Sequence, residues 1–457
     1  MSDFTPHTDA EVAEMLAAIG LSSVEELFSA VPEALRLAGG LDVAAGLSEA
    51  DVGERVAEVA GANRPTGRQL VCFAGGGAYE HDVPAVVRRV AFRSEFVTAY
   101  TPYQPEVAQG VLQALFEYQT VVCRLFGMEV ANASLYDGAS ACVEAANLAV
   151  AATGRPTVWV SRGVHPQWRS VMATFAAGTG HRLVDVGLAD GVTAWAGDAA
   201  REGEEPAALV VQYPNYLGCI DDLAAAAETA RRTGALLVVV SDPVAAGLLR
   251  PPGTYGADVV VGEGQPFGTP LSFGGPYLGM FACTRDLVRR LPGRLVGETV
   301  DVDGRRAYVT TLRTREQDIR REKASSNVCT NQTLIAVACI VHLAWLGTAG
   351  LREMALRCAR GARYAREAVL AIPGVEPLAT APVLREFALR LPVAADVVVE
   401  RMADEGFLAG IPLGPEYVGD GTGHDPQSHG LLVAVTERRT RAEIDAYAAA
   451  LQKVVTS

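Results

Sequence analysis

The sequence predicts an α/β fold built on a mostly parallel β-sheet that helices cover on both faces. Short, almost continuous apolar runs recur through the middle of the chain, and helical segments such as residues 221–234 separate them. Such runs are typical of parallel strands that are buried on both faces. The expected strands are PTVWVS, RLVDV, AALVVQ, ALLVVVSD, DVVVG and LGMFACT.

The chain of 457 residues is long enough for several domains, and we expect three parts. Residues 1–65 form a helical N-terminal arm, in which Thr8 with Glu11 and Ser23 with Glu26 have the spacing of capping boxes. Residues 66–345 form the large α/β domain. Residues 346–457 form a smaller α+β domain with strands EFALRL and LLVAV and a final helix.

A long amphipathic helix is expected to begin at Pro105, with Glu106 in its first turn and Gly127 at its end. The apolar residues spaced for its buried side are Val107, Val111, Leu115, Val122 and Phe126.

Composition excludes several classes of protein. A formal net charge of −14 argues against nonspecific nucleic-acid binding, which needs a basic surface. The 8 cysteines include no C-x-x-C pair, so a zinc site or a disulfide framework is not expected. The polar N-terminus does not resemble a signal peptide, and no apolar run is expected to reach the length of a membrane span. The chain is therefore expected to be soluble and cytoplasmic.

Four candidate site features are expected to cluster beyond the carboxyl ends of the strands, where open parallel sheets bind ligands. Asp242 ends a strand and could bond a pyridinium nitrogen, Ser140 lies in a helix start suited to an anion, and His165 could stack on a cofactor. A glycine-rich segment, GEGQPFGTPLSFGGPYLG, follows DVVVG. Each feature also has an ordinary structural explanation as a turn, cap or tight loop.

Lysine is nearly absent from the chain. Only Lys323 and Lys453 occur among 39 basic residues, and neither lies in the loop directly after DVVVG, where a pyridoxal-phosphate (PLP) enzyme of this pattern needs its Schiff-base lysine. Arginine bias could account for part of this, but arginine cannot replace a catalytic lysine.

Four long segments make the chain similar to subunit 1 (alpha) of the glycine cleavage system P-protein family. They are PHTDAEVAEMLAAIGLSSVEELF, YTPYQPEVAQGVLQALFEYQTVVCRLFGMEVANASLYDGAS, GEGQPFGTPLSFGGPYLG and RTREQDIRREKASSNVCTNQTL. The resemblance implies a fold-type I PLP-transferase architecture. It also implies an α2β2 assembly in which the beta subunit carries the lysine in a segment of the form HKTFxIPHGGGGPG.

When GQPFGTPLSFGGPY is laid on that beta segment, Gln265 stands at the lysine. The resemblance therefore implies that PLP is bound by the beta subunit, with no covalent cofactor on this chain. Gln265, Asp242, His165 and Ser140 are then vestigial cofactor positions. The intact assembly would decarboxylate glycine and pass its aminomethyl group to the lipoyl arm of the H-protein.

We expect this chain to contribute to the partner's active site through the loop YTPYQPE. The candidate residues are Tyr100, Thr101, Tyr103, Gln104 and Glu106. The alternative is that Glu106 only favours the helix N-terminus and the tyrosines pack. Tyr79 and His81, in a glycine-rich segment, are a second candidate, although a surface turn is equally consistent with that sequence.

Two sets of arginines could contact the carrier or the partner, or simply form solvated helix faces: Arg313, Arg315, Arg320 and Arg321, and Arg357, Arg360 and Arg363. Two alternative functions stay open. The chain could be a noncatalytic scaffold or regulatory pseudoenzyme, or a self-sufficient PLP enzyme that uses Lys323.

Overall fold

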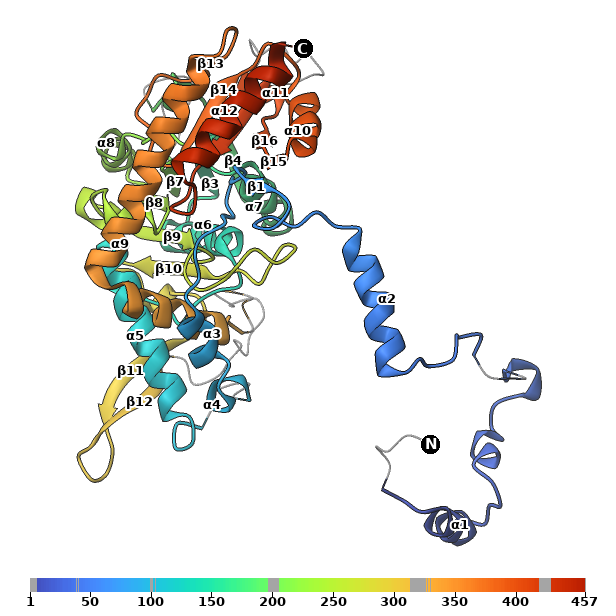
Figure 1. The fold of residues 1–457 in the computed structure, drawn as a ribbon. Helices are drawn as coiled ribbons and strands as arrows, with labels where there is room; N and C mark the ends of the chain where they lie inside the picture. The colour runs from blue at the N-terminus through green and yellow to red at the C-terminus, as the bar shows by residue number, and fades with distance from the viewer. Residues whose placement is uncertain are drawn as a thin grey trace. The chain divides into compact units, whose positions relative to one another are not determined.

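The computed structural model divides the chain into two compact units, residues 1–64 and 65–457 (Figure 1). It describes residues 6–37, 39, 41–98, 102, 104–195, 205–312, 326, 328, 330–418 and 429–456. The first boundary lies next to the end expected for the N-terminal arm. The expected division of the remainder at residue 345 stays a prediction.

Unit 1 is helical and has no core among its described residues. Its elements are α1 (Asp9–Ala18), the 3-10 helices η1 (Glu25–Phe28) and η2 (Glu33–Leu35), and α2 (Glu49–Gly61). The capping box of Thr8 and Glu11 is present at the start of α1. The second expected box opens only a four-residue 3-10 helix, because Glu26 turns its carboxylate to the amide and hydroxyl of Ser22.

Unit 2 is built on a seven-stranded sheet. Its strands, in spatial order, are β2 (Val130–Ala131), β10 (Gly279–Cys283), β9 (Val259–Glu263), β8 (Leu236–Ser241), β7 (Ala208–Tyr213), β3 (Thr157–Ser161) and β4 (Arg182–Val186). The five strands from β9 to β4 are parallel, and β10 is antiparallel to β9. All six strands expected for this sheet are present.

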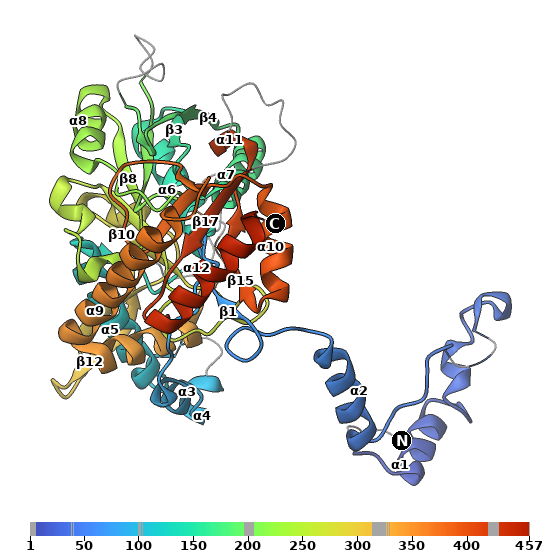
Figure 2. The same ribbon diagram turned by 45° about the horizontal axis from the view of Figure 1, so that its top comes forward.

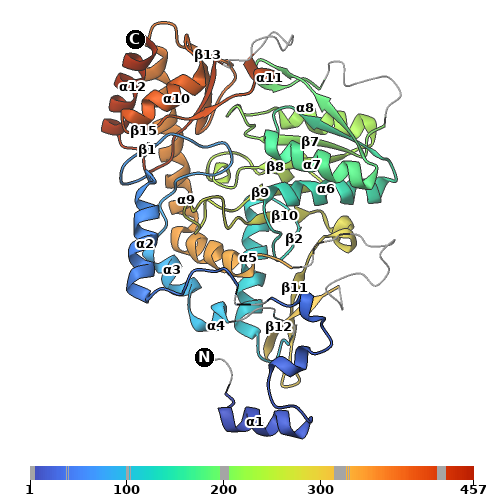
Figure 3. The same cartoon turned by 90° about the vertical axis from the view of Figure 1, so that its right-hand side faces the viewer.

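Helices cover both faces of this sheet (Figure 3). The side chains of β7 alternate: Ala208 and Val210 pack with α6 (Gly138–Thr153) and α7 (Pro166–Thr179). Leu209 and Val211 belong to the opposite core, with α5 (Gln109–Phe126), α8 (Leu223–Thr233) and the first half of α9 (Thr333–Leu370). Period-two alternation thus divides one apolar strand between two cores.

Helix α5 begins at Gln109, four residues later than expected. Residues 105–107 form a turn instead, in which the amides of Val107 and Ala108 donate to the carbonyls of Gln104 and Pro105. Val107 is 82% exposed, so its predicted place on the buried side is wrong. The other four predicted core positions are buried, and Gly127 ends the helix in the left-handed conformation with φ 69°.

The C-terminal part of unit 2 has a four-stranded sheet covered by α10 (Ala395–Asp404), α12 (Arg441–Thr456) and the second half of α9 (Figure 2). The order of its strands is β13 (Glu376–Pro377), β14 (Glu386–Arg390), β17 (Gly430–Ala434) and β16 (Ile411–Pro412). Strand β1 (Val71–Cys72) pairs with β15 (Phe407–Leu408), so residues that follow unit 1 along the chain join this region.

The remaining elements are short. They are α3 (Ala85–Ala91), α4 (Ser94–Val97), β5 (Leu188–Ala189), β6 (Val192–Thr193), η3 (Ala245–Gly247), η4 (Pro252–Tyr255), η5 (Arg285–Arg290), the hairpin β11 (Leu295–Val300) and β12 (Arg306–Thr311), and α11 (Pro415–Val418).

The expectation that no apolar run is long enough to span a membrane is wrong. By length and composition alone, α9 is the one helix among the described residues that could do so, and 39% of its most apolar window is buried within the protein. Core packing explains the apolar run: Ala336, Cys339 and Leu343 lie in the core beneath the large sheet. The backbone departs from helical geometry at Gly347.

Candidate functional site

The candidate site lies at the carboxyl ends of the parallel strands, and the tertiary structure brings its predicted residues together. Asp242 directly follows β8, and His165 precedes the first residue of α7 and accepts a hydrogen bond from the Gln167 amide. His165 and Asp242 line one small cavity of about 40 Å³. His165 and Ser140 line a neighbouring, larger pocket of about 270 Å³.

Gln265 is buried, and its side-chain amide forms three hydrogen bonds with neighbouring backbone groups. Its Nε2 donates to the carbonyls of Tyr79 and Thr269 at 3.0 and 2.8 Å. Its Oε1 accepts from the Tyr79 amide at 3.0 Å. Gln265 therefore joins the backbone of Tyr79 to the loop after β9, and its side chain has no group that can form an imine.

Asp242 makes an ion pair with Arg385, which precedes β14. Arg385 Nε lies 2.7 Å from Asp242 Oδ2, and the Val244 amide donates to the other oxygen at 3.0 Å. The guanidinium also lies over the Tyr79 ring, 3.6 Å from its centroid. Burial acts to lower the pKa of Arg385, but Asp242 and the neighbouring acidic groups hold it above its usual range.

His81 continues this buried chain of polar contacts. Its Nε2 lies 2.7 Å from Arg385 Nη1, and its Nδ1 lies 2.6 Å from Glu437 Oε2. Because guanidinium only donates, Nε2 must accept, and Nδ1 must carry the proton that is donated to Glu437. Burial lowers the pKa of His81, in agreement with a neutral ring. Burial acts to raise the pKa of Glu437, but the hydrogen bonds that it accepts from His81 and from the Asp82 amide hold the pKa at about 2.

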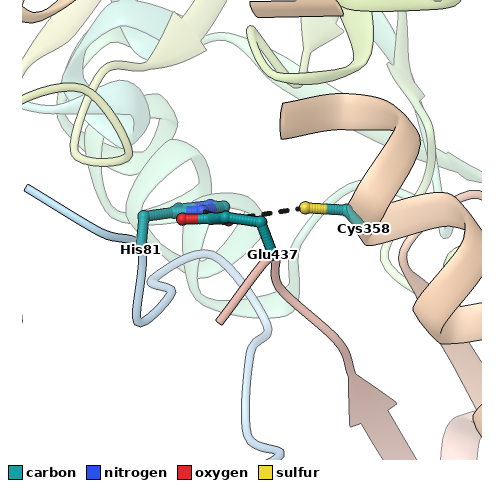
Figure 4. A group of neighbouring side chains, drawn as sticks. All are labelled: His81, Cys358 and Glu437. Carbon is teal, nitrogen blue, oxygen red and sulfur yellow. Dashed lines mark hydrogen bonds and ion pairs between the residues drawn. The ribbon is translucent and has the colours of Figure 1, made fainter. Parts of the chain in front are cut away.

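Cys358 lies on the other side of Glu437 (Figure 4). Its Sγ is 3.6 Å from Glu437 Oε2. The ligand atoms of His81, Cys358 and Glu437 lie within 4.8 Å of one another, which is the composition of a metal site. Metal binding at Nδ1 of a neutral His81 would require a proton on Nε2, directly against the Arg385 donor. This geometry favours the hydrogen-bonded chain over a metal centre.

The N-terminus of α6 is occupied by carboxylates of the chain itself. Asp137 accepts from the Ser140 amide at 2.7 Å. Glu263, the last residue of β9, accepts from the amides of Gly138, Gln265 and Leu278 at 2.9, 2.9 and 2.8 Å. Burial raises the pKa of Glu263 to about 8, although all three donors favour its charged form.

Trp168 covers the same helix start. A side-chain carbon added at Gly138 would lie 2.1 Å from the Trp168 ring, so only glycine fits there. Trp168 and His165 are stacked with their ring centroids 5.9 Å apart. The imidazole thus stacks on a tryptophan of its own helix.

Comparison with known proteins identifies the family. The glycine cleavage system P-protein family model matches residues 2–408. The chain belongs to the glycine cleavage system P-protein family. This P-protein is 48% identical to the probable glycine dehydrogenase (decarboxylating) subunit 1 of Moorella thermoacetica, with 99% of both chains covered. It is 46% identical to the subunit 1 of Desulforamulus reducens, over 98% of this chain and 99% of the relative.

Solved structures agree with this assignment. The crystal structure of glycine decarboxylase (P-protein) in inhibitor-bound form is 45% identical, with a TM-score of 0.89 over 99% of this chain and 100% of that chain. A Lactobacillus brevis glutamate decarboxylase, 12% identical with a TM-score of 0.67 over 95% of this chain and 97% of that chain, shares only the fold. The fold expected from the sequence and the family resemblance are both confirmed.

PLP occurs in this class of enzyme, but the site of this P-protein chain does not fit it. Gln265 cannot form an imine, Arg385 already pairs with the carboxylate that would bond the ring nitrogen, and Glu263 takes an amide at the helix N-terminus. The cavity beside Asp242 has room for only a few water molecules.

The loop proposed to contribute to the partner's site is described only in part. Tyr100, Thr101 and Tyr103 lie outside the described residues, as does Lys323. Gln104 and Glu106 are exposed and belong to the turn before α5. Because this turn precedes the helix, Glu106 does not lie in its first turn, as the alternative explanation required.

The other predicted candidates differ in their surroundings. Tyr79 and His81 are 8% and 4% exposed, so they do not form a surface turn. Arg357 and Arg363 are exposed and pair with Glu353 and Glu367 one helical turn away. The arginines at 313–321 lie outside the part of the chain that the structure describes.

Sequence reasoning missed Glu263, Arg385 and Glu437. Glu263 stood inside the glycine-rich segment, but a glutamate after an apolar strand suggests a turn. Arg385 precedes Glu386 at the start of the expected strand EFALRL, and adjacent charges entering a buried strand are unusual enough to indicate an internal ion pair.

Proposed function

We propose that this chain is subunit 1 of a two-chain glycine dehydrogenase (decarboxylating) and that a second subunit carries the Schiff-base lysine and PLP. The holoenzyme would decarboxylate glycine and pass the aminomethyl group to the lipoyl arm of the H-protein. The proposal includes a cytoplasmic α2β2 assembly. Membership of the P-protein family and the names of the subunit 1 relatives support the reaction and the need for a partner.

The buried side chain of Gln265 carries the assignment of the cofactor to the partner. It stands in the loop after β9, where this family pattern places the lysine, and it is held by three hydrogen bonds to the backbone. Its side chain provides no amine. The role left to this chain is to shape and close the partner's site, so that the reacting groups are screened from water.

The surface turn at residues 104–107 is the proposed point of contribution. Gln104 and Glu106 offer an amide and a carboxylate on the exposed side of this turn. Pro105 stiffens it, since its ring fixes one backbone torsion. Exposed polar groups on a stiffened turn can meet a partner with little loss of conformational entropy.

Borohydride reduction in the presence of PLP, followed by peptide mass spectrometry, tests the proposal. This chain is labelled alone and together with its candidate second subunit. We expect the pyridoxyl label on the second subunit only, and glycine decarboxylation only when both chains and a lipoylated carrier are present. Stoichiometric labelling of Lys323 on the isolated chain would contradict the proposal and favour a self-sufficient enzyme.

The contribution of the turn is tested separately, in the assembled enzyme. Glu106→Gln and Gln104→Ala are expected to assemble normally and to reduce turnover about 10-fold, because a hydrogen bond that stabilises the transition state by about 1.4 kcal/mol changes the rate tenfold. Glu129→Gln, an exposed glutamate outside the turn, serves as the control. Unchanged turnover in all three variants would favour the scaffold alternative.

A further inference from the structure

We propose that Arg385 is a built-in replacement for the cofactor ring, and that it fastens the C-terminal region permanently to the parallel sheet. A PLP site uses a carboxylate to bond the nitrogen of a planar, positively charged ring. In this chain a planar guanidinium, which is always charged, forms an ion pair with Asp242: Nε lies 2.7 Å from Oδ2, without the alignment of a hydrogen bond. The inference rests on the proposed function, because it takes this chain as the one without the cofactor.

The guanidinium of Arg385 is buried against an aromatic ring. Arg385 is 3% exposed, and its Cζ lies over the Tyr79 ring, 3.6 Å from the ring centroid. Such a desolvated cation–π contact stabilises a planar charge without a further counterion. The Tyr79 hydroxyl in turn donates to Glu386 at 2.8 Å. The space that remains beside Asp242 is about 40 Å³, less than a substituted pyridine needs, and the larger pocket of about 270 Å³ adjoins it at His165, Trp168 and Glu263.

Arg385 also connects distant parts of the chain. Asp242 follows β8 of the large sheet, whereas Arg385 precedes β14 of the C-terminal sheet. The contact continues through His81 to Glu437, which follows β17. The distances are 2.7 Å between Asp242 and Arg385, 2.7 Å between Arg385 and His81, and 2.6 Å between His81 and Glu437.

A second connection runs beside the first. Glu386 accepts from the Gly76 amide at 2.7 Å and from the Tyr79 hydroxyl. The glycine-rich segment at residues 75–77 is therefore held between the two regions. Loss of one member of such a network leaves an uncompensated buried charge, which is far more costly than loss of an exposed pair.

The test compares full-length wild type with Arg385→Ala and Arg439→Ala. Arg439 is a matched control. Its side chain is 4% exposed, as is that of Arg385, and it forms an ion pair with Glu80 at 2.7 Å, but it lies outside the contacts that link Asp242 to Glu437. Thermal unfolding is followed alone and with each of three small molecules at equal ionic strength. Pyridoxine supplies the ring, methylguanidinium supplies a planar cation, and methylammonium is the control cation that is not planar.

We expect both substitutions to lower Tm by roughly 5–10 °C. Pyridoxine and methylguanidinium should recover several degrees in Arg385→Ala, and methylammonium should not. Wild type and Arg439→Ala should not respond to pyridoxine. Arg385→Lys, which keeps the charge but not the planar fork, should lose stability and gain no response to pyridoxine.

Two results would overturn the inference. Wild type whose Tm rises by several degrees with pyridoxine would show that the guanidinium does not fill the ring's place. A folded Arg385→Ala that responds to neither ring nor guanidinium would do the same. The wild-type measurement needs no variant to fold. Neither result bears on which subunit is labelled by borohydride, so the proposed function would stand.

Discussion

Gln265 shows how one residue can decide both chemistry and stability. Replacement by alanine leaves the amide and carbonyl of Tyr79 and the carbonyl of Thr269 without their partner in a buried place. Gln265→Ala should therefore lower the free energy of unfolding by about 3 kcal/mol, as measured by urea denaturation. Gln113→Ala, whose amide meets Glu117 on an exposed helix face, should change it by less than about 0.5 kcal/mol. Equal effects would contradict this reading.

Glu263 gives the protein a predicted pH dependence. Its pKa in the folded protein is about 8, above the ordinary 4.5, mainly because it is buried. The folded state therefore holds a proton that the unfolded state has released, so its contribution to stability is full below about pH 4.5 and is lost as pH rises through 8.

The measurement is the urea midpoint between pH 6 and 9. Wild type should lose stability over this range, and Glu263→Gln should show a flatter profile because its side chain does not titrate. Glu58→Gln removes an exposed carboxylate of α2 and should keep the wild-type profile. If the profile of Glu263→Gln matches wild type, the buried carboxyl group titrates in its ordinary range.

At the scale of elements, the close approach of one loop to β14 depends on a glycine. Gly218 has φ +83°, and a side-chain carbon there would lie 2.0 Å from the Glu386 carbonyl oxygen. Gly218→Ala should cost at least about 4 kcal/mol, because both the backbone conformation and the space are wrong. Gly154→Ala also starts from a left-handed glycine, φ +71°, but nothing lies within 4 Å of the added atom. It should cost about 1 kcal/mol, and a similar loss in both would contradict the steric argument.

Sequence patterns predicted the strands and helices of the two sheets well, because burial on both faces leaves a strong apolar signal in β7, β8 and β9. The start of α5 was misplaced for a local reason. The sequence at Pro105 fits a helix start, but the carbonyls of Gln104 and Pro105 accept hydrogen bonds within a turn. The Gln109 side chain forms two hydrogen bonds with the backbone of Tyr308 in β12.

For the whole molecule, the two units should differ in their resistance to proteolysis. No described residue of unit 1 is buried, and 14 of its large apolar side chains are exposed, including Leu27, Phe28 and Leu35. Short helices without tertiary packing are marginally stable in water. Limited trypsin digestion should therefore cut at Arg36 and Arg55 well before any site in the core of unit 2, as followed by mass spectrometry.

Addition of the second subunit supplies the control for this experiment. If the exposed apolar side chains of unit 1 are covered in the assembly, cleavage at Arg36 and Arg55 should slow at least about 10-fold, because cleavage follows the population of the open form. Equal cleavage of the two units in the isolated chain would contradict the prediction.

The sequence alone determined the family, the class of fold and the absence of a lysine from the loop after DVVVG, since these depend on long segments, apolar periodicity and the identity of single residues. Only the tertiary structure could decide what fills the site. Asp242, Arg385, His81 and Glu437 are far apart along the chain and carry no pattern that links them. Their contacts form because the two sheets bring strand ends together. A buried charge without a partner is costly, so the partners are residues that the tertiary fold, not the sequence order, places nearby.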